Sequence, residues 1–255
     1  MYDESVEIIE NRRINGKYFK LIFKSRRLAK NVAPGQFMQI QIEPALDPFL
    51  RRPFSYYRVS SSGKIEIMYE VLGRGTALLA RKKKGDDLRV LGPLGRGFTR
   101  NLKAGRKRIL VAGGVGVPPL VFLAENVKIG GLLIGTKSKA EVLPKSELKN
   151  IKGPVFYSTN DGSYGKKGYV TKLLLELLKK PEFRNAYIQT CGPNVMMEAV
   201  IKIAREAGFE GEASVDKEMA CGVGACLGCM VKTLAGWKPS CVEGPVFGFH
   251  EIESL

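Results

Sequence analysis

Four of the five cysteines gather near the C-terminal end of the chain, in a spacing that restricts what this region can fold around. They are Cys221, Cys226, Cys229 and Cys241, and their spacing is C-x4-C-x2-C-x11-C. The first three positions match a loop that wraps a [2Fe-2S] cluster, and such a cluster needs four thiolates in total. The sequence therefore predicts that these four residues are the metal ligands of one [2Fe-2S] cluster.

Glycines inside this loop support the same interpretation. Gly222, Gly224 and Gly228 let the backbone curl tightly while its N–H groups point at negative charge. Structural zinc is one alternative, but zinc sites usually have two close ligand pairs and this chain has one C-x2-C pair. A disulfide framework is another, but a chain of 255 residues builds its own core and this one shows no secretion signal. The last gap is shorter than in plant ferredoxins, so we expect a compact variant.

Length and composition indicate two compact domains and a small appendage. The chain is 44% hydrophobic, which is enough to furnish cores. Its longest apolar run, residues 109–124, is interrupted by three glycines and two prolines, so no membrane span is expected. The N-terminus lacks a basic segment followed by an apolar one, and we therefore expect a cytoplasmic protein.

The formal net charge is +16, which raises the question of nucleic-acid binding. The basic residues occur in short scattered groups without interleaved stacking aromatics, so no nucleic acid is expected. Solvated faces, dinucleotide phosphates and an acidic protein partner explain the charge better. The single histidine, His250, excludes a Ser/His/Asp triad and a Rieske cluster. We therefore expect no catalytic side chain, and any chemistry to be carried by cofactors.

The first part of the chain, residues 1–99, has the pattern of an all-β unit. Short or alternating apolar runs at 18–23, 36–42 and 64–71 are separated by Pro-Gly and Ser-rich turns. This pattern predicts a small antiparallel barrel, closed by tight turns in residues 91–98.

Two short motifs in this part have the chemistry of a phosphate site. The strand Arg52–Ser55 brings a guanidinium and a hydroxyl side by side, which suits a pyrophosphate. The same residues could equally form a strand with a surface arginine. The turn Gly73–Thr76 precedes the helical residues 77–80, with threonine expected as the helix cap. Most Gly-x-Gly-Thr turns are only turns, so the motif is weak alone.

From about residue 104 strands and helices alternate. A buried strand at 108–112 runs into a glycine loop at 113–119 and then a helix, the context of a dinucleotide loop, although Pro119 replaces the last glycine. A second glycine turn, Cys191–Pro193, follows another strand and precedes a helix. We predict a doubly wound parallel lobe. No acidic residue ends the second strand, so charge does not decide between NAD and NADP.

With these parts in this order, the chain resembles ferredoxin-reductase-type flavoproteins. It is most similar to the electron-transfer subunits of the two-subunit, NAD-linked dihydroorotate dehydrogenases, and the similarity extends over nearly the full length. The motifs that carry it are Arg51–Ser55, Gly73–Thr76, Gly92–Gly95, Ala112–Gly116, Thr159–Ser163, Cys191–Pro193, Met219–Cys221 and Cys241–Phe247.

The resemblance implies an oxidoreductase of pyrimidine biosynthesis with FAD, one [2Fe-2S] cluster and NAD as substrate. It also implies an FMN-containing partner that oxidises dihydroorotate, in a heterotetramer of two copies of each subunit. The expected domains are an FAD-binding β-barrel at 1–99, an NAD-binding α/β domain at 104–210 and a cluster domain at 211–255.

The site residues that the resemblance implies fall into two groups. Those for FAD are Arg52, Pro53, Phe54, Ser55, Met68, Tyr69, Glu70, Gly75 and Thr76, and those for NAD are Gly113, Gly114, Gly116, Cys191, Gly192 and Pro193. Cys191 is open to a second interpretation as a buried small hydrophobe. Two alternative functions also stay open: the NAD(P)H-linked subunit of another complex, such as a ferredoxin:NADP transhydrogenase or a cytoplasmic hydrogenase, and a zinc-binding interaction module.

Overall fold

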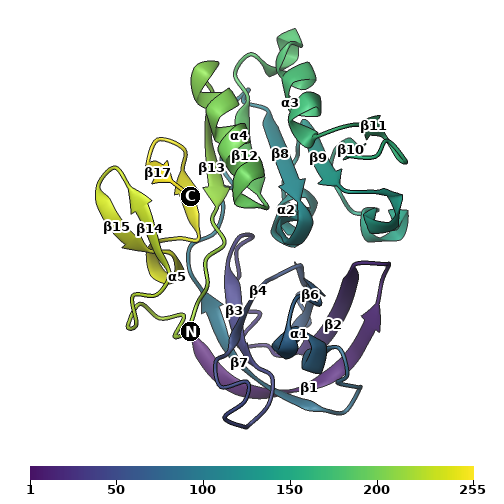
Figure 1. Ribbon diagram of the computed structural model, residues 1–255, viewed down its shortest axis with the longest axis vertical. Helices are drawn as coiled ribbons and strands as arrows, with labels where there is room; N and C mark the ends of the chain where they lie inside the picture. The colour runs from purple at the N-terminus through teal and green to yellow at the C-terminus, as the bar shows by residue number, and fades with distance from the viewer.

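The computed structural model describes all residues, 1–255, and shows three packed parts (Figure 1). An antiparallel sheet curls at the bottom of the view, a parallel sheet flanked by helices lies above it, and the last strands of the chain pack at the side of both. No helix is long and apolar enough to cross a membrane.

The first part is a seven-stranded antiparallel sheet in the order β4-β3-β7-β1-β2-β6-β5, which confirms the predicted barrel class. Its interior is apolar, with Ile8, Leu21 and Ile67 fully buried. The strands are β1 (Tyr2–Arg13), β2 (Tyr18–Lys24), β3 (Phe37–Gln41), β4 (Arg52–Ser55), β5 (Arg58–Val59), β6 (Lys64–Glu70) and β7 (Asp87–Leu94), with helix α1 (Arg74–Leu79) after β6.

One prediction within the barrel was wrong. Residues 91–98 were expected to form tight turns, but residues 91–94 continue β7 and pair with both β1 and β3. Strand β7 alternates buried Leu88 and Val90 with exposed neighbours, so one face is fixed in the core. Because this face is buried, the strand continues through Gly92-Pro93, a dipeptide that in sequence alone predicts a turn.

The second part is a parallel sheet in the order β11-β10-β9-β8-β12-β13, with β16 added antiparallel at the edge. This confirms the doubly wound class. Helix α2 covers the face toward the barrel, whereas α3 and α4 pack on the opposite face. The strands are β8 (Arg108–Gly113), β9 (Gly131–Thr136), β10 (Val155–Thr159), β11 (Lys166–Lys167), β12 (Tyr187–Cys191), β13 (Glu210–Ser214) and β16 (Val246–Gly248), and the helices are α2 (Val117–Asn126), α3 (Val170–Leu178) and α4 (Asn194–Glu206).

The remaining elements form a small three-stranded antiparallel sheet of order β15-β14-β17. They are β14 (Met230–Thr233), β15 (Gly236–Pro239), the short helix α5 (Ser240–Glu243) and β17 (Ile252–Ser254). Strand β16 lies between α5 and β17 in sequence but pairs with β13. This pairing holds the C-terminal residues 230–254 against the parallel sheet. The domain boundaries given above stay a prediction.

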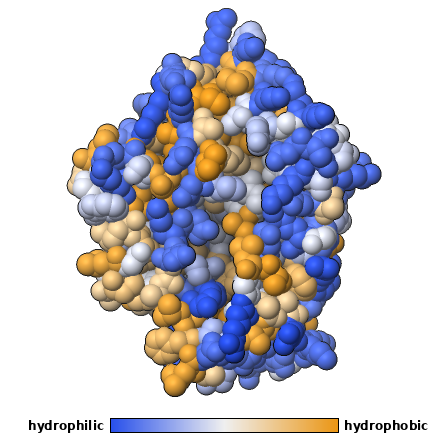
Figure 2. Space-filling view, viewed as in Figure 1, coloured by the Kyte–Doolittle hydropathy of each residue, from blue (hydrophilic) through white to orange (hydrophobic).

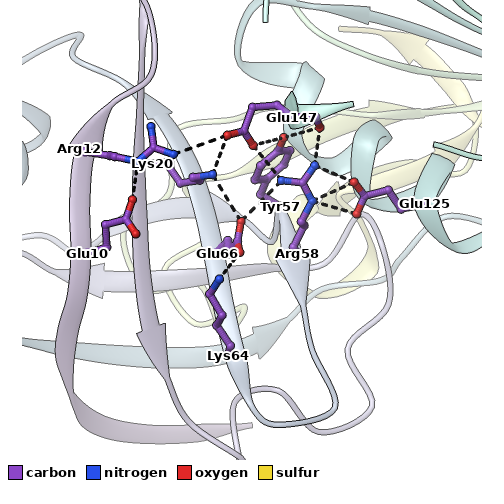
Figure 3. Close-up of polar contacts among 9 residues, drawn as sticks. All are labelled: Glu10, Arg12, Lys20, Tyr57, Arg58, Lys64, Glu66, Glu125 and Glu147. Atoms are coloured by element: carbon purple, nitrogen blue, oxygen red, sulfur yellow. Dashed lines mark hydrogen bonds and ion pairs between the residues drawn. The ribbon is translucent and has the colours of Figure 1, made fainter. Parts of the chain in front are cut away.

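A buried ion-pair network joins the barrel to the parallel lobe (Figure 3). Arg58 of β5 contacts Glu125 of α2, with Nη2 at 2.6 Å from Oε1, and Glu147, with Nη1 at 2.9 Å from Oε2. Lys20 of β2 reaches the same Glu147 at 2.6 Å, and the Tyr57 hydroxyl donates to it. Burial raises the pKa of Glu147, but the hydrogen bonds and charges of Lys20 and Arg58 outweigh this and hold it below its usual value. The network therefore fixes how the two lobes sit together.

Candidate functional site

A cleft of about 390 Å³ lies where the barrel meets the C-terminal ends of the parallel strands. Strands β4 and β6 and the start of α1 form its barrel side, and the loop after β8, with the ends of β12 and β13, forms its other side. Strands β8 and β12 are neighbours at the point where the strand order reverses, which is where doubly wound sheets bind ligands. Figure 2 shows this face of the molecule.

The cleft gathers most of the residues that the sequence singled out. Gly113, Gly114 and Pro193 do not line it, but they lie together directly beside it, with Pro193 within 4 Å of the Cβ position of each glycine. The predicted residues that line the cleft are Arg52, Pro53, Phe54, Ser55, Met68, Tyr69, Glu70, Gly75, Thr76, Gly116, Cys191 and Gly192. Their roles toward FAD and NAD stay predictions.

The barrel side of the cleft is built to receive an anion. The Arg52 guanidinium donates only to the main-chain carbonyls of Leu50 and Arg51, so it has further N–H groups to offer. It lies against Gly75, where an added Cβ would come within 3.0 Å of Nε. A cation without a carboxylate partner beside a glycine turn fits the pyrophosphate of a dinucleotide.

Helix α1 begins earlier than predicted, and threonine is not its cap. Gly73 is the N-cap, and Thr76 lies in the first turn. The Thr76 hydroxyl accepts hydrogen bonds from the N–H groups of Leu72 and Gly73, at 2.9 and 3.2 Å. The side chain therefore reaches back and holds the turn closed, which a glycine at the cap position cannot do.

The opposite wall of the cleft carries Cys191 at the end of β12. Burial raises the pKa of its thiol to about 12, and the nearby Asp216 carboxylate adds to the effect. The thiol therefore stays neutral at physiological pH. Asp216 lines the same cleft, and its enclosure there raises its pKa. Cys191 both packs in the core of the lobe and faces the cleft, so the two interpretations of this residue are compatible.

Gly116 owes its identity to the close approach of two backbone segments. A Cβ at this position would lie 2.2 Å from the carbonyl carbon and oxygen of Cys191. The glycine loop after β8 can thus lie against the end of β12 only where residue 116 has no side chain. This packing reason holds whether or not a dinucleotide is bound.

We expect Gly116→Ala to lower the melting temperature by about 5 °C or more, because backbone atoms cannot move aside and overpacking alone costs about 1–3 kcal/mol. The measurement is thermal unfolding of the holoprotein. Gly16→Ala is the control, because its Cβ would meet only exposed Ala140, with the carbonyl oxygen at 3.3 Å and Cβ at 3.9 Å. Equal melting temperatures for the two variants would contradict this account of the loop.

The cysteine loop has the geometry of an anion-binding nest. Gly222, Gly224 and Leu227 have φ values of 72°, 82° and 55°, which turn successive N–H groups inward. The N–H groups of Val223 and Cys226 donate to Sγ of Cys221 at 3.4 Å. The N–H group of Gly224 donates to Sγ of Cys241 at 3.1 Å. The N–H group of Cys241 in turn donates to Sγ of Cys229 at 3.4 Å.

All four loop cysteines are free thiols, and they form two pairs. Cys221 lies beside Cys226, and Cys229 beside Cys241, because the N–H group of the second residue of each pair donates to the sulfur of the first. Burial opposes ionisation of Cys221, but the N–H donors of the loop lower its pKa to about 6, whereas burial and the neighbouring Cys229 raise that of Cys241 to about 12. Two thiol pairs fit two irons, as the spacing predicts.

Several residues that line the cleft were not predicted as site residues. Phe37 of β3 and Met219 before the cysteine loop both line it, and both pack with Cys229 and Cys241. The alternation of side chains along β3 indicates that the strand has two faces, but it does not indicate which segments of the chain pack on each face. Asp216 carried no signal of its own, because it follows a strand that the sequence pattern does not mark.

Comparisons with known proteins agree with this geometry. Residues 216–253 match the family described as the iron-sulfur cluster binding domain of dihydroorotate dehydrogenase B. The chain is 38% identical over 239 residues to the dihydroorotate dehydrogenase B (NAD(+)) electron transfer subunit of Desulforamulus reducens, covering 90% of both chains. The corresponding subunit of Clostridium acetobutylicum is 38% identical over 250 residues, covering 96% of this chain and 95% of the relative.

Solved structures share the fold. The NADH-dependent reduced ferredoxin-NADP oxidoreductase structure is 28% identical with a TM-score of 0.85, covering 98% of this chain and 90% of that one. A ferredoxin NADP+ reductase from Neisseria gonorrhoeae has a TM-score of 0.68 at 16% identity, covering 82% and 92%, and shows the fold alone. Together with the full-length relatives, the cleft and the paired thiols, this shows that the chain belongs to the family of electron-transfer subunits of NAD-linked dihydroorotate dehydrogenase B, which are oxidoreductases.

Proposed function

We propose that this subunit passes electrons from a dihydroorotate-oxidising partner to NAD through a [2Fe-2S] cluster and FAD. A flavin exchanges both hydride and single electrons, so FAD supplies the conversion between the partner's one-electron path and the nicotinamide. The four cysteines hold the cluster, and the barrel side of the cleft holds FAD. The loop after β8 and the C-terminal end of β12 receive the nicotinamide dinucleotide.

One observation carries this proposal: the cleft and the cysteine loop share a wall. Phe37 lines the cleft and packs with the buried Cys229 and Cys241. Met219 and Pro245 also line the cleft from the C-terminal segment. A one-electron carrier in the loop would therefore adjoin a flavin in the cleft, with the side chains of Phe37 and Met219 in the wall between them.

Each wall of the cleft has a separate task in this proposal. Arg52 and the Gly73–Thr76 turn hold the pyrophosphate, while Ser55 and the strand Met68–Glu70 orient the ring system. Cys191 and Gly192 shape the nicotinamide side, where a neutral thiol offers no competing nucleophile. Burial of the opposite faces of these strands keeps the cleft walls rigid.

The partner contacts the cysteine loop in this proposal. Cys226 is exposed, and apolar Val223, Leu227 and Val242 reach the surface around it, at 41%, 59% and 45% exposure. Figure 2 shows apolar side chains at the surface over the C-terminal segment, at the left of the molecule. Exposed apolar groups beside a one-electron carrier suit a protein interface more than open solvent.

The family resemblance extends the proposal to the assembly. The partner is the FMN-containing catalytic subunit, and the complex holds two copies of each chain. All five cysteines are free, which fits the reducing cytoplasm as the compartment. Light scattering of the copurified complex tests the stoichiometry, and a mass that corresponds to one copy of each chain would contradict it.

The direct test of the function is reconstitution. Mixing this subunit with its catalytic partner should give NADH from dihydroorotate and NAD, with neither protein active alone. NADH formation by the partner alone would contradict the assignment, as would reduction of ferredoxin in place of NAD.

We expect Thr76→Val to weaken FAD binding about tenfold, because two N–H groups of the turn lose their acceptor and one hydrogen bond is worth about 0.5–1.5 kcal/mol. Fluorescence titration of FAD into apoprotein measures this. Thr171→Val on α3, outside the cleft, is the control. Unchanged FAD affinity in Thr76→Val would remove the turn from the FAD site.

A further inference from the structure

Gln39 is a polar side chain whose burial needs an explanation. It is fully buried, and neither its amide nitrogen nor its amide oxygen has a hydrogen-bond partner within the protein. Buried amides are nearly always hydrogen-bonded, because leaving one unpaired costs free energy. The residue therefore indicates a partner that the polypeptide alone does not provide.

The position of Gln39 in β3 shows where such a partner lies. Met38 and Ile40 point into the barrel core, so Phe37 and Gln39 lie on the other face of the strand. Phe37 on that face packs with Cys229 and Cys241. Gln39 is placed beside it, opposite Leu91 of β7 and Pro53 of β4 in the strand register.

The cysteine loop covers this face directly over the amide. A Cβ on Gly222 would lie 2.7 Å from Cγ of Gln39 and 3.1 Å from Nε2. Gly222 follows Cys221 and has a φ of 72°. Gln39 does not line the cleft, whereas Phe37 two residues earlier does. The amide therefore faces the loop and not the dinucleotide.

We propose that Gln39 donates a hydrogen bond from Nε2 to a sulfur of the [2Fe-2S] centre held by this loop, either a thiolate or an inorganic sulfide. The inference rests on the proposed ligation by the four cysteines. A donor aimed at sulfur stabilises the more negative, reduced state of a cluster and so raises its reduction potential. Gln39 thus sets, by direct contact, how readily the centre accepts an electron.

The test is an EPR-monitored redox titration of the Gln39→Met holoprotein. Methionine keeps the shape of the side chain and removes the donor. One-electron reduction of the cluster should become at least about tenfold less favourable, a midpoint about 59 mV more negative, with iron and sulfide content unchanged. Leu91→Met is the matched control, because it alters the same packed face without removing a donor. We expect it to change the equilibrium constant for one-electron reduction of the cluster by less than about twofold.

An unchanged midpoint in a fully loaded Gln39→Met protein would overturn the inference. Wild-type protein gives a second test that does not depend on any variant folding. With 15N placed only in glutamine side-chain amides, pulsed EPR of the reduced cluster should show a nitrogen coupling, and its absence would also overturn the inference. The amide of Gln36 is engaged elsewhere, because it donates to the carbonyl of Gly95. Loss of the nitrogen coupling in Gln39→Met assigns the coupling to Gln39. A wild-type protein without iron would instead refute the proposed function.

Discussion

Replacing Cys226 with serine is expected to abolish dihydroorotate-linked reduction of NAD while leaving NADH oxidation by an artificial dye largely intact. Cys226 is exposed, so the change removes a proposed cluster ligand without disturbing a core. Loss of residues that only support a metal ligand costs about 10–100-fold, and loss of a ligand itself should cost at least the upper value. Steady-state assays measure the two activities separately, one with dihydroorotate and NAD and the other with NADH and the dye.

The control for this variant is Leu234→Ser, which alters an exposed side chain of the same C-terminal segment outside the cysteine loop. It should retain both activities. If Cys226→Ser loses both activities to the same extent, the cluster does not lie between the partner and FAD, and the proposed order of carriers is wrong.

Arg58→Met is expected to lower the free energy of unfolding by about 3–5 kcal/mol, because it leaves buried carboxylates without their partner. Glu125 and Glu147 come from the parallel lobe, and each has about a tenth or less of its side chain exposed. Urea unfolding of the FAD-loaded protein at pH 7 measures the loss. Lys232→Met, which breaks an exposed pair with Glu253, should cost less than about 1 kcal/mol.

The effect of Arg58→Met should also depend on pH. The folded-state pKa of Glu147 lies below its ordinary value of 4.5, so the stability it contributes is complete above that value. This contribution is lost as the pH falls through the lowered pKa. The difference between wild type and Arg58→Met should therefore shrink in acid. A difference that grows below pH 4.5 would show that the network is not held by ionised Glu147.

Much of the fold follows from local patterns in the sequence. The strand from Arg108 and the helices that contain Val121 and Leu174 are continuous apolar or periodic runs, which predict their own structure. The strand β1 escaped detection because it is rich in charged residues. Only Val6 and Ile8 of its twelve residues are buried, so the strand depends on its neighbours β2 and β7 for its conformation.

The site divides in the same way. The gathering of the four loop cysteines and the glycine turns beside the cleft could be predicted, because spacing and residue type are visible in a sequence; ligation by those cysteines stays a prediction. Gln39, Asp216 and Arg58 could not, since each acts through contacts with segments far away in the chain. Gln39 faces a loop more than a hundred residues later, and nothing in its local sequence marks it as buried on both sides.

The central claim is that one chain holds both a two-electron carrier and a one-electron carrier. Anaerobic reductive titration of the purified subunit, followed by its visible absorption, tests this most directly. We predict that reduction is complete after about three electron equivalents per chain, two for FAD and one for the cluster. An end point at about two equivalents would show a flavoprotein without a cluster, and a colourless protein that takes up none would contradict the account entirely.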